Sequence, residues 1–165
     1  MFDAVFDSCV LIDYDFGGGI AVLAQHFAGR ANITRYVRDQ ELGKGLAKGK
    51  PDPCLHDGVS WIGTLDLDSD EHQLADELTL LLGKRHRGEA EGIAVCHFRR
   101  ATFCSRDADA IIQAAERGVT VISTSGILNA LVRNGVLPYA AALVIIKAMA
   151  PRGIDEQLLI KPSGV

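Results

Sequence analysis

Several patterns are absent from this sequence, and each absence excludes a class of protein. The 165 residues carry a formal net charge of −4 at pH 7. The chain is therefore not a nucleic-acid binder that relies on an overall basic composition. The longest apolar stretch, residues 140–146, is followed by Lys147 and is too short to span a bilayer. We therefore expect a protein that does not enter the membrane.

Cysteine pairs and leader sequences are missing as well. The four cysteines contain no C-x-x-C pair, and no pair of histidines at zinc-site spacing accompanies them. This arrangement is typical of reduced thiols. Residues 1–7 lack both the basic region and the long apolar region of a signal peptide. Together these observations predict a cytoplasmic protein.

What the sequence does contain is an alternation of strand-like and helix-like segments. Strands are expected at residues 4–6, 61–67, 101–104 and 119–122. Helices are expected at 20–27, 33–42, 68–82, 88–97, 107–117, 127–133 and 138–149, with a loop at 43–58. Such alternation predicts an α/β fold in three layers, a central parallel sheet flanked by helices. The length and positive mean hydropathy suit one domain, expected at residues 1–150, before a C-terminal tail at 151–165.

Acidic residues stand at the ends of several of these segments. Asp7 ends the first strand, where an unpaired buried carboxylate would be strongly unfavourable. The carboxyl ends of parallel strands border the crevice in which α/β proteins bind ligands, so we expect this side chain to face such a crevice. Three further acids can reach the same crevice: Glu41 or Asp39, Glu89 or Glu91, and Asp107 or Asp109.

A cluster of this kind predicts a metal site. Carboxylates held close together repel one another, and Mg²⁺ or Mn²⁺ removes the repulsion because these cations prefer carboxylate oxygen. A cation so held can steady a phosphoryl oxygen. The simpler explanation is that first turns of helices favour acids, which accounts for Glu89, Asp107 and Asp109. It does not account for Asp7.

Four segments resemble the PIN-domain nucleases. Residues 5–12, V-F-D-S-C-V-L-I, resemble the strand and Asp-Ser/Thr pair with which that family begins. Residues 88–94, G-E-A-E-G-I-A, are similar to a segment of a subgroup related to VapC-type toxins. Residues 104–107, C-S-R-D, resemble a strand ending in Ser/Thr-x-Asp. Residues 118–128 match the subgroup's G-[VL]-x-V-x-G-T-x-G-[VIL]-L except at Ser123, and the resemblance extends from about residue 3 to residue 137.

The resemblance implies a metal-dependent endoribonuclease that hydrolyses RNA. The family's acids fall on Asp7, Glu41, Glu89 and Asp107. The resemblance implies that Asp7, Glu89 and Asp107 hold Mg²⁺ or Mn²⁺, and that Glu41 orients a water molecule or completes the site. Besides Ser123, the sequence departs from the family in two places. Cys9 stands where the family has Asn or Ser, and in V-R-D-Q-E-L, residues 37–42, the family's V-x-x-E-L is displaced by one residue, which keeps Asp39 as an alternative.

Basic and hydroxyl residues beside these acids are candidates for contact with RNA. The segment 84–87, K-R-H-R, precedes Glu89 and can hold phosphates, although a solvated basic helix end explains it equally well. Arg106 can clamp a phosphate or pair with surface acids. The predicted RNA-binding set is Ser8, Ser105, Arg106, Arg85 and Arg87.

The resemblance also suggests partners besides the RNA substrate. A small antitoxin would be expected if the chain is the toxin of a toxin–antitoxin pair. A homodimer would be expected to use the loop at 43–58 and the helix at 138–149. The alternative is an inert PIN-like module that binds RNA or protein without catalysis.

Overall fold

The fold is built on a parallel sheet of short strands. The computed structural model describes residues 3–162, and within them this sheet has five strands in the order β5-β2-β1-β6-β7. The strands are β1 (Ala4–Phe6), β2 (Ala31–Thr34), β5 (Gly63–Leu65), β6 (Thr102–Cys104) and β7 (Val121–Ile122). All neighbouring pairs in it are parallel. The expected α/β fold with a central parallel sheet is confirmed.

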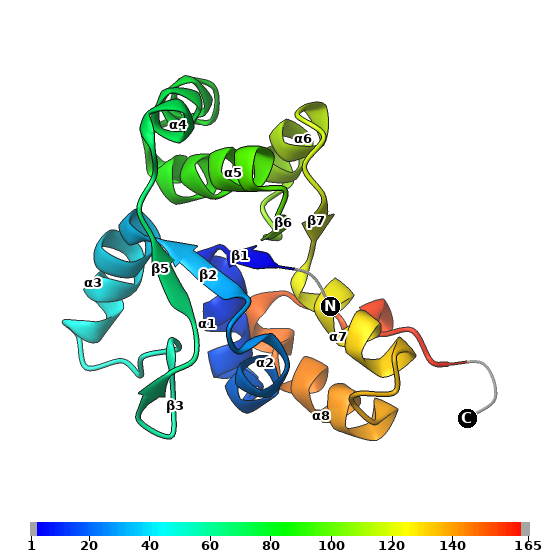
Figure 1. Cartoon of the computed structure of the whole chain (residues 1–165). Coiled ribbons are helices and arrows are strands. Elements are labelled where there is room, and N and C mark those ends of the chain that lie inside the picture. The colour runs from blue at the N-terminus through cyan, green and yellow to red at the C-terminus, as the bar shows by residue number, and fades with distance from the viewer. Residues whose placement is uncertain (1–2, 163–165) are drawn as a thin grey trace.

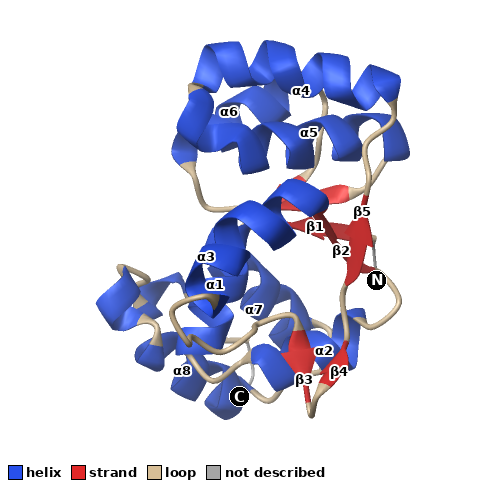
Figure 2. Cartoon of the chain, turned by 90° about the vertical axis from the view of Figure 1, so that its left-hand side faces the viewer, coloured by secondary structure: helices blue, strands red, loops and turns tan. Residues whose placement is uncertain are grey.

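Helices cover both faces of the sheet (Figure 1). One face carries α4 (Ser69–Leu82), α5 (Arg87–Arg99) and α6 (Ala108–Glu116). The other face carries α1 (Ser8–Phe16), α2 (Ile20–Phe27), α7 (Thr124–Arg133) and α8 (Tyr139–Ala148). Figure 2 shows the two helical layers on opposite sides of the strands. The central strands β1 and β6 are therefore fully buried, whereas the edge strand β5 is largely exposed.

The side chains of β1 show why this strand is apolar throughout. Ala4 and Phe6 pack into the core beneath α1, α2, α7 and α8, whereas Val5 packs into the core beneath α4, α5 and α6. On β6, Phe103 and Cys104 divide between the two cores in the same way. Successive side chains of a strand point to opposite faces, so a strand covered on both sides needs apolar residues at every position.

The expected helix at residues 33–42 was wrong in its first part. Ile33 and Thr34 belong to β2, and the helical segment begins at residue 35 and continues as a π-helix, η1 (Val37–Leu42), and a short α3 (Gly43–Leu46). Both misassigned residues are β-branched, which favours a strand. Helix α1 was not expected, and the expected loop at 43–58 contains α3 and part of a hairpin of β3 (Leu55–His56) with β4 (Val59–Ser60).

The start of α4 agrees with the sequence pattern. Asp68 accepts a hydrogen bond from the Glu71 amide, and Glu71 accepts one from the Asp68 amide, both at 2.9 Å. This is the expected capping box. Three 3₁₀ helices complete the described elements: η2 (Lys84–His86), η3 (Ala150–Arg152) and η4 (Glu156–Leu158).

The segment after residue 150, expected as a tail, packs on the rest of the protein. Ile154 and Leu159 are buried in the core beneath α1, α2, α7 and α8. Asn129 of α7 donates to the Leu158 carbonyl and accepts from the Ile160 amide. Within residues 3–162, no helix is long and apolar enough to cross a membrane.

Candidate active site

The four acids implied by the family resemblance converge at the carboxyl edge of the sheet. Asp7 follows β1 and Asp107 follows β6, and these two strands are neighbours with Phe6 opposite Cys104. Helix α5 ends just before β6 begins, so its first turn, which contains Glu89, returns to the carboxyl edge. Glu41 approaches from η1, which follows β2 on the other side of β1.

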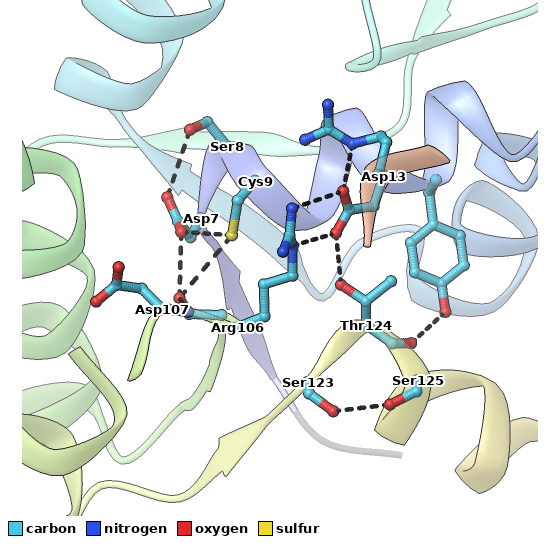
Figure 3. Close-up of polar contacts among 12 residues, drawn as sticks. Asp7, Ser8, Cys9, Asp13, Arg106, Asp107, Ser123, Thr124 and Ser125 are labelled. Atoms are coloured by element: carbon cyan, nitrogen blue, oxygen red, sulfur yellow. Dashed lines mark hydrogen bonds and ion pairs between the residues drawn. The ribbon is translucent and has the colours of Figure 1, made fainter. Parts of the chain in front are cut away.

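Asp7 is a buried carboxylate whose side chain is turned toward the site. It occupies the N-cap position of α1, but its carboxylate accepts hydrogen bonds from Ser105 Oγ, at 3.1 Å, and from the Cys9 thiol. Figure 3 shows Asp7 with its contact to Cys9. Only 2% of Asp7 is exposed. Burial and the negative charge of Glu89 raise the pKa of Asp7 to about 6, although the two hydrogen bonds act in the opposite direction.

Glu41 is the second acid of the site. Ser8 Oγ donates to its carboxylate and also lies 3.5 Å from Asp7 Oδ1, so this hydroxyl lies between the two acids. Burial raises the pKa of Glu41 to about 7, and the charges of Asp7 and Glu89 add to the effect. Asp39 is exposed, and its charge contributes to raising the pKa of Arg35. The structure therefore brings Glu41, and not Asp39, to the other acids.

A glycine of α5 makes room for Glu41. A Cβ atom built on Gly88 would lie 2.1 Å from Glu41 Oε1 and 3.0 Å from a methyl group of Val37. The Glu41 carboxylate thus lies directly against the first turn of α5, next to Glu89. Gly88, the first glycine of the G-E-A-E-G segment, is therefore required because a side chain from a different element approaches it closely.

Glu89 and Asp107 form a compact group with His86. The Nδ1 atom of His86 lies 3.1 Å from Glu89 Oε1 and 4.0 Å from Asp107 Oδ2. One ligand atom from each of the three residues lies within 4.8 Å of the others, which is close enough for a shared metal ion. The other Asp107 oxygen, Oδ1, accepts from the Ala110 amide at 2.9 Å and caps α6. The alternatives lie elsewhere: Glu91 pairs with Arg87, and Asp109 is exposed.

His86 is the site residue that the sequence interpretation missed. Arg85 Nε donates to His86 Nε2 at 2.9 Å, so the ring hydrogen is on Nδ1 and is donated to Glu89. The imidazole therefore holds one oxygen of Glu89 in place. The signal was the His-x-x-Glu spacing, which places both residues on one side of a helical turn.

The structure gives other partners to most of the residues predicted to contact RNA. Arg87 pairs with Asp76 and Glu91. Ser105 is fully buried beneath the acids, where it donates to Asp7 and accepts from the Asp107 amide at 3.2 Å. Ser105 is therefore placed to orient the two aspartates.

Arg106 belongs to a network around Asp13. The Asp13 carboxylate is fully buried and contacts Arg106 Nε at 2.8 Å, Arg152 Nε at 2.5 Å and Thr124 Oγ1 at 2.9 Å. Figure 3 shows Arg106 reaching across to Asp13 from the loop that bears Asp107. The network joins α1, α7, the loop after β6 and the segment after α8. It holds the loop that presents Asp107, because the buried Asp13 carboxylate would be left without this compensating charge if Arg106 moved away.

Comparison of the chain with protein-family models, curated proteins and solved structures gave no match. The features that bear on function are therefore the four acids Asp7, Glu41, Glu89 and Asp107 together with His86. Two of these acids are carboxylates with raised pKa values, and all four meet where α/β proteins bind ligands. Perturbed acids in such a position are typical of functional sites.

Proposed function

We propose that this chain is a divalent-metal-dependent endoribonuclease of the PIN-domain type, acting at Asp7, Glu41, Glu89 and Asp107. The observation that carries the proposal is the burial of Asp7 against Glu89, which raises the pKa of Asp7 to about 6. A carboxylate in this position destabilises the fold when it is charged, and a bound cation would offset that penalty. Binding to RNA or protein alone does not require such a cluster.

The donor atoms fit a hard divalent cation. Asp7, Glu89 and Asp107 would hold Mg²⁺ or Mn²⁺ through carboxylate oxygens, with His86 fixing the orientation of Glu89. Glu89 and Asp107 already lie at metal-sharing distance, whereas Asp7 is not part of that close group and would join it when the cation binds. When bound, the cation supplies Lewis-acid stabilisation of a phosphoryl group.

The residues of the chain supply proton transfer and orientation. Glu41, with a pKa of about 7, is suited to take a proton from a water molecule near neutral pH. Ser8 orients Glu41, and Ser105 orients Asp7. The reaction class supported is hydrolysis of a phosphodiester bond, with RNA proposed as the substrate from the family resemblance.

The proposal includes a cytoplasmic location. All four cysteines lie in the described part of the chain and are free thiols, which supports a reducing, cytoplasmic location. A role as the toxin of a toxin–antitoxin pair, a small antitoxin as partner, and a homodimer all stay predictions from the resemblance.

A cleavage assay with single-stranded and structured RNA in Mn²⁺ or Mg²⁺ tests the proposal. We expect Asp7→Asn and Asp107→Asn to reduce cleavage more than about 100-fold, since even residues that only orient metal ligands change affinity or activity roughly 10–100-fold. Asp109→Asn is the matched control, because Asp109 is an exposed acid in the first turn of α6. Asp7→Asn protein that cleaves as fast as the wild type in Mn²⁺ would overturn the proposal.

Calorimetric titration with Mn²⁺ separates the enzyme from the inert binding module. We expect wild-type protein to bind Mn²⁺ and Asp107→Asn protein to bind it much more weakly. If the wild type binds no Mn²⁺, the inert module is the better description of the chain.

A further inference from the structure

A groove rimmed by lysines opens beside Glu41. It has a volume of about 240 Å³, and its lining includes Lys44, Lys48 and Lys50 as well as Glu41 itself. These three lysines and the surface between them are called the lysine groove below. All three lysines are exposed. Lys44 lies close enough to Glu41 for its charge to lower the pKa of that acid, against the larger effect of burial. The groove is therefore continuous with the candidate active site.

The lysine groove has apolar surface as well as positive charge. Ile12, Leu42, Pro51 and Pro53 contribute to its lining. Ile12 is one of the larger apolar side chains left exposed, at 37%. Apolar surface beside a row of cations suits a ligand that has both flat apolar groups and repeated negative charges.

The lysines extend from a segment whose backbone is well anchored. Lys48 and Lys50 donate their amides to the Gly45 carbonyl at 3.0 and 3.1 Å. At the far end, Arg38 forms a two-pronged ion pair with Asp52, at 2.7 and 2.8 Å. The Trp61 indole donates to the Pro53 carbonyl at 2.9 Å. The backbone that carries Lys48 and Lys50 is thus held in place by contacts within the chain.

The lining of the lysine groove also contains two acids, Asp15 and Glu41, so its lysines outnumber its acids by one. Within residues 3–162, none of its three lysines forms an ion pair with an acid, whereas Lys147 pairs with Glu156 at 3.3 Å. The chain as a whole has a net charge of −4. Three cations placed together on an acidic protein, next to a cluster of acids, point to an anionic polymer that must be led to those acids.

We propose that the lysine groove binds single-stranded RNA and leads it to Glu41. The lysines contact successive phosphates, and the apolar floor receives unpaired bases or riboses. A duplex keeps its bases stacked inside and offers the floor only sugar and phosphate, so single strands fit better. The choice of RNA as the polymer rests on the proposed function. The groove assigns to residues 44–53 a role in substrate binding, where the family resemblance suggested a dimer contact.

Fluorescence anisotropy with a labelled single-stranded RNA, in EDTA to prevent cleavage, tests the proposal. The triple variant Lys44→Gln, Lys48→Gln, Lys50→Gln is expected to bind at least about 10-fold more weakly at low salt. The slope of log affinity against log salt concentration should fall by about 2, since each phosphate contact on a single strand contributes about 0.7. The Lys→Arg triple variant at the same positions should keep the wild-type slope.

The control variant Arg133→Gln, Lys147→Gln, Lys161→Gln removes the same charge from exposed positions elsewhere and should bind like the wild type. If the glutamine variant of the groove keeps wild-type affinity and slope, or if the wild type fails to bind single-stranded RNA or prefers a duplex, the groove proposal is overturned. If binding depends on the groove lysines but no metal-dependent cleavage occurs, the groove stands and the proposed nuclease function fails.

Discussion

Two glycines of α5 lie one turn apart, and each faces a side chain that leaves no room for a Cβ atom. At Gly88 the obstacle is the carboxylate of Glu41, 2.1 Å from the Cβ position. At Gly92 it is the ring of Phe103, 2.4 Å from the Cβ position. The consequences differ because Glu41 is a half-buried side chain at the site, whereas Phe103 is fully buried in the core.

We expect Gly88→Ala to impair catalysis while leaving the fold nearly as stable as the wild type. The added methyl group displaces the Glu41 carboxylate, so RNA cleavage should fall roughly 10–100-fold, as for the loss of other orienting contacts. Alanine also suits a helix better than glycine, by up to about 1 kcal/mol. Cleavage rates and thermal unfolding of the same preparation measure the two effects.

Gly92→Ala is the matched comparison, and we expect it to lower stability rather than to impair catalysis directly. Its methyl group meets the Phe103 ring, and overpacking of a core typically costs about 1–3 kcal/mol, so the melting temperature should fall. A Gly88→Ala protein with wild-type cleavage would show that Glu41 can move aside without loss, and that its contact with α5 does not matter for activity.

Among the elements, the π-helix η1 explains the displaced V-x-x-E-L pattern. Val37 and Leu42 are buried at its two ends, and the sequence has one residue more between them than the family pattern has. The Gly43 amide donates to the Arg38 carbonyl, five residues back. A π-helical turn holds one extra residue within a helix, so both buried ends keep their places and Glu41 still reaches the site.

Deletion of Gln40 is expected to convert η1 into an ordinary α-helical turn. The deletion restores V-x-x-E-L, so Glu41 should stay near Ser8, and cleavage should remain within about 10-fold of wild type because π turns are an optional insertion. Deletion of Gln73, also exposed, is the control. It would rotate the rest of α4 by about 100° and turn Leu78 out of the core. Circular dichroism and cleavage assays compare the two; equal destabilisation by both deletions would contradict the interpretation of η1.

The sequence pattern alone could therefore not decide whether Glu41 or Asp39 reaches the site. It depends on whether the turn is α or π, and tertiary anchoring of Val37 and Leu42 decides that. Strand β2 was mistaken for helix because Ile33, Tyr36 and Val37 have helical spacing, while a four-residue strand offers little pattern of its own. The capping box and the strands before Asp7 and Asp107 were predictable, because each is encoded within a few neighbouring residues.

Contacts between distant parts of the chain were the least predictable features of the site. His86 lies near Asp107 only in the folded protein, where the start of α5 meets the loop after β6. The partner of Arg106 is Asp13, which lies 93 positions away in the sequence. The spacing of neighbouring residues does not predict such long-range pairings. The lysine groove is similar, since Ile12 and Pro53 meet there from separate elements.

For the whole molecule, the buried acids couple stability to pH and, under the proposed function, to metal. The pKa of Asp7 rises from 3.8 to about 6 on folding, and that of Glu41 from 4.5 to about 7. Both shifts are upward, so the folded state binds protons more tightly than the unfolded state. The stability from these groups is fully present below about pH 4 and is lost as the pH rises through 6 to 7. Above that range the proposed cation, by binding only the folded protein, would restore stability.

In EDTA at pH 8, we therefore expect Asp7→Asn to melt at a higher temperature than the wild type. A pKa shift of about 2 corresponds to about 3 kcal/mol, and each kcal/mol moves the melting temperature by roughly 2–4 °C, so the gain should be about 5 °C or more. The difference should vanish by pH 4, where the wild-type carboxyl is protonated. Mn²⁺ at pH 8 should narrow it by stabilising the wild type, while Asp109→Asn should show no such pattern. An Asp7→Asn protein less stable than the wild type at pH 8 in EDTA would mean that Ser105 and Cys9 compensate the buried charge without a metal.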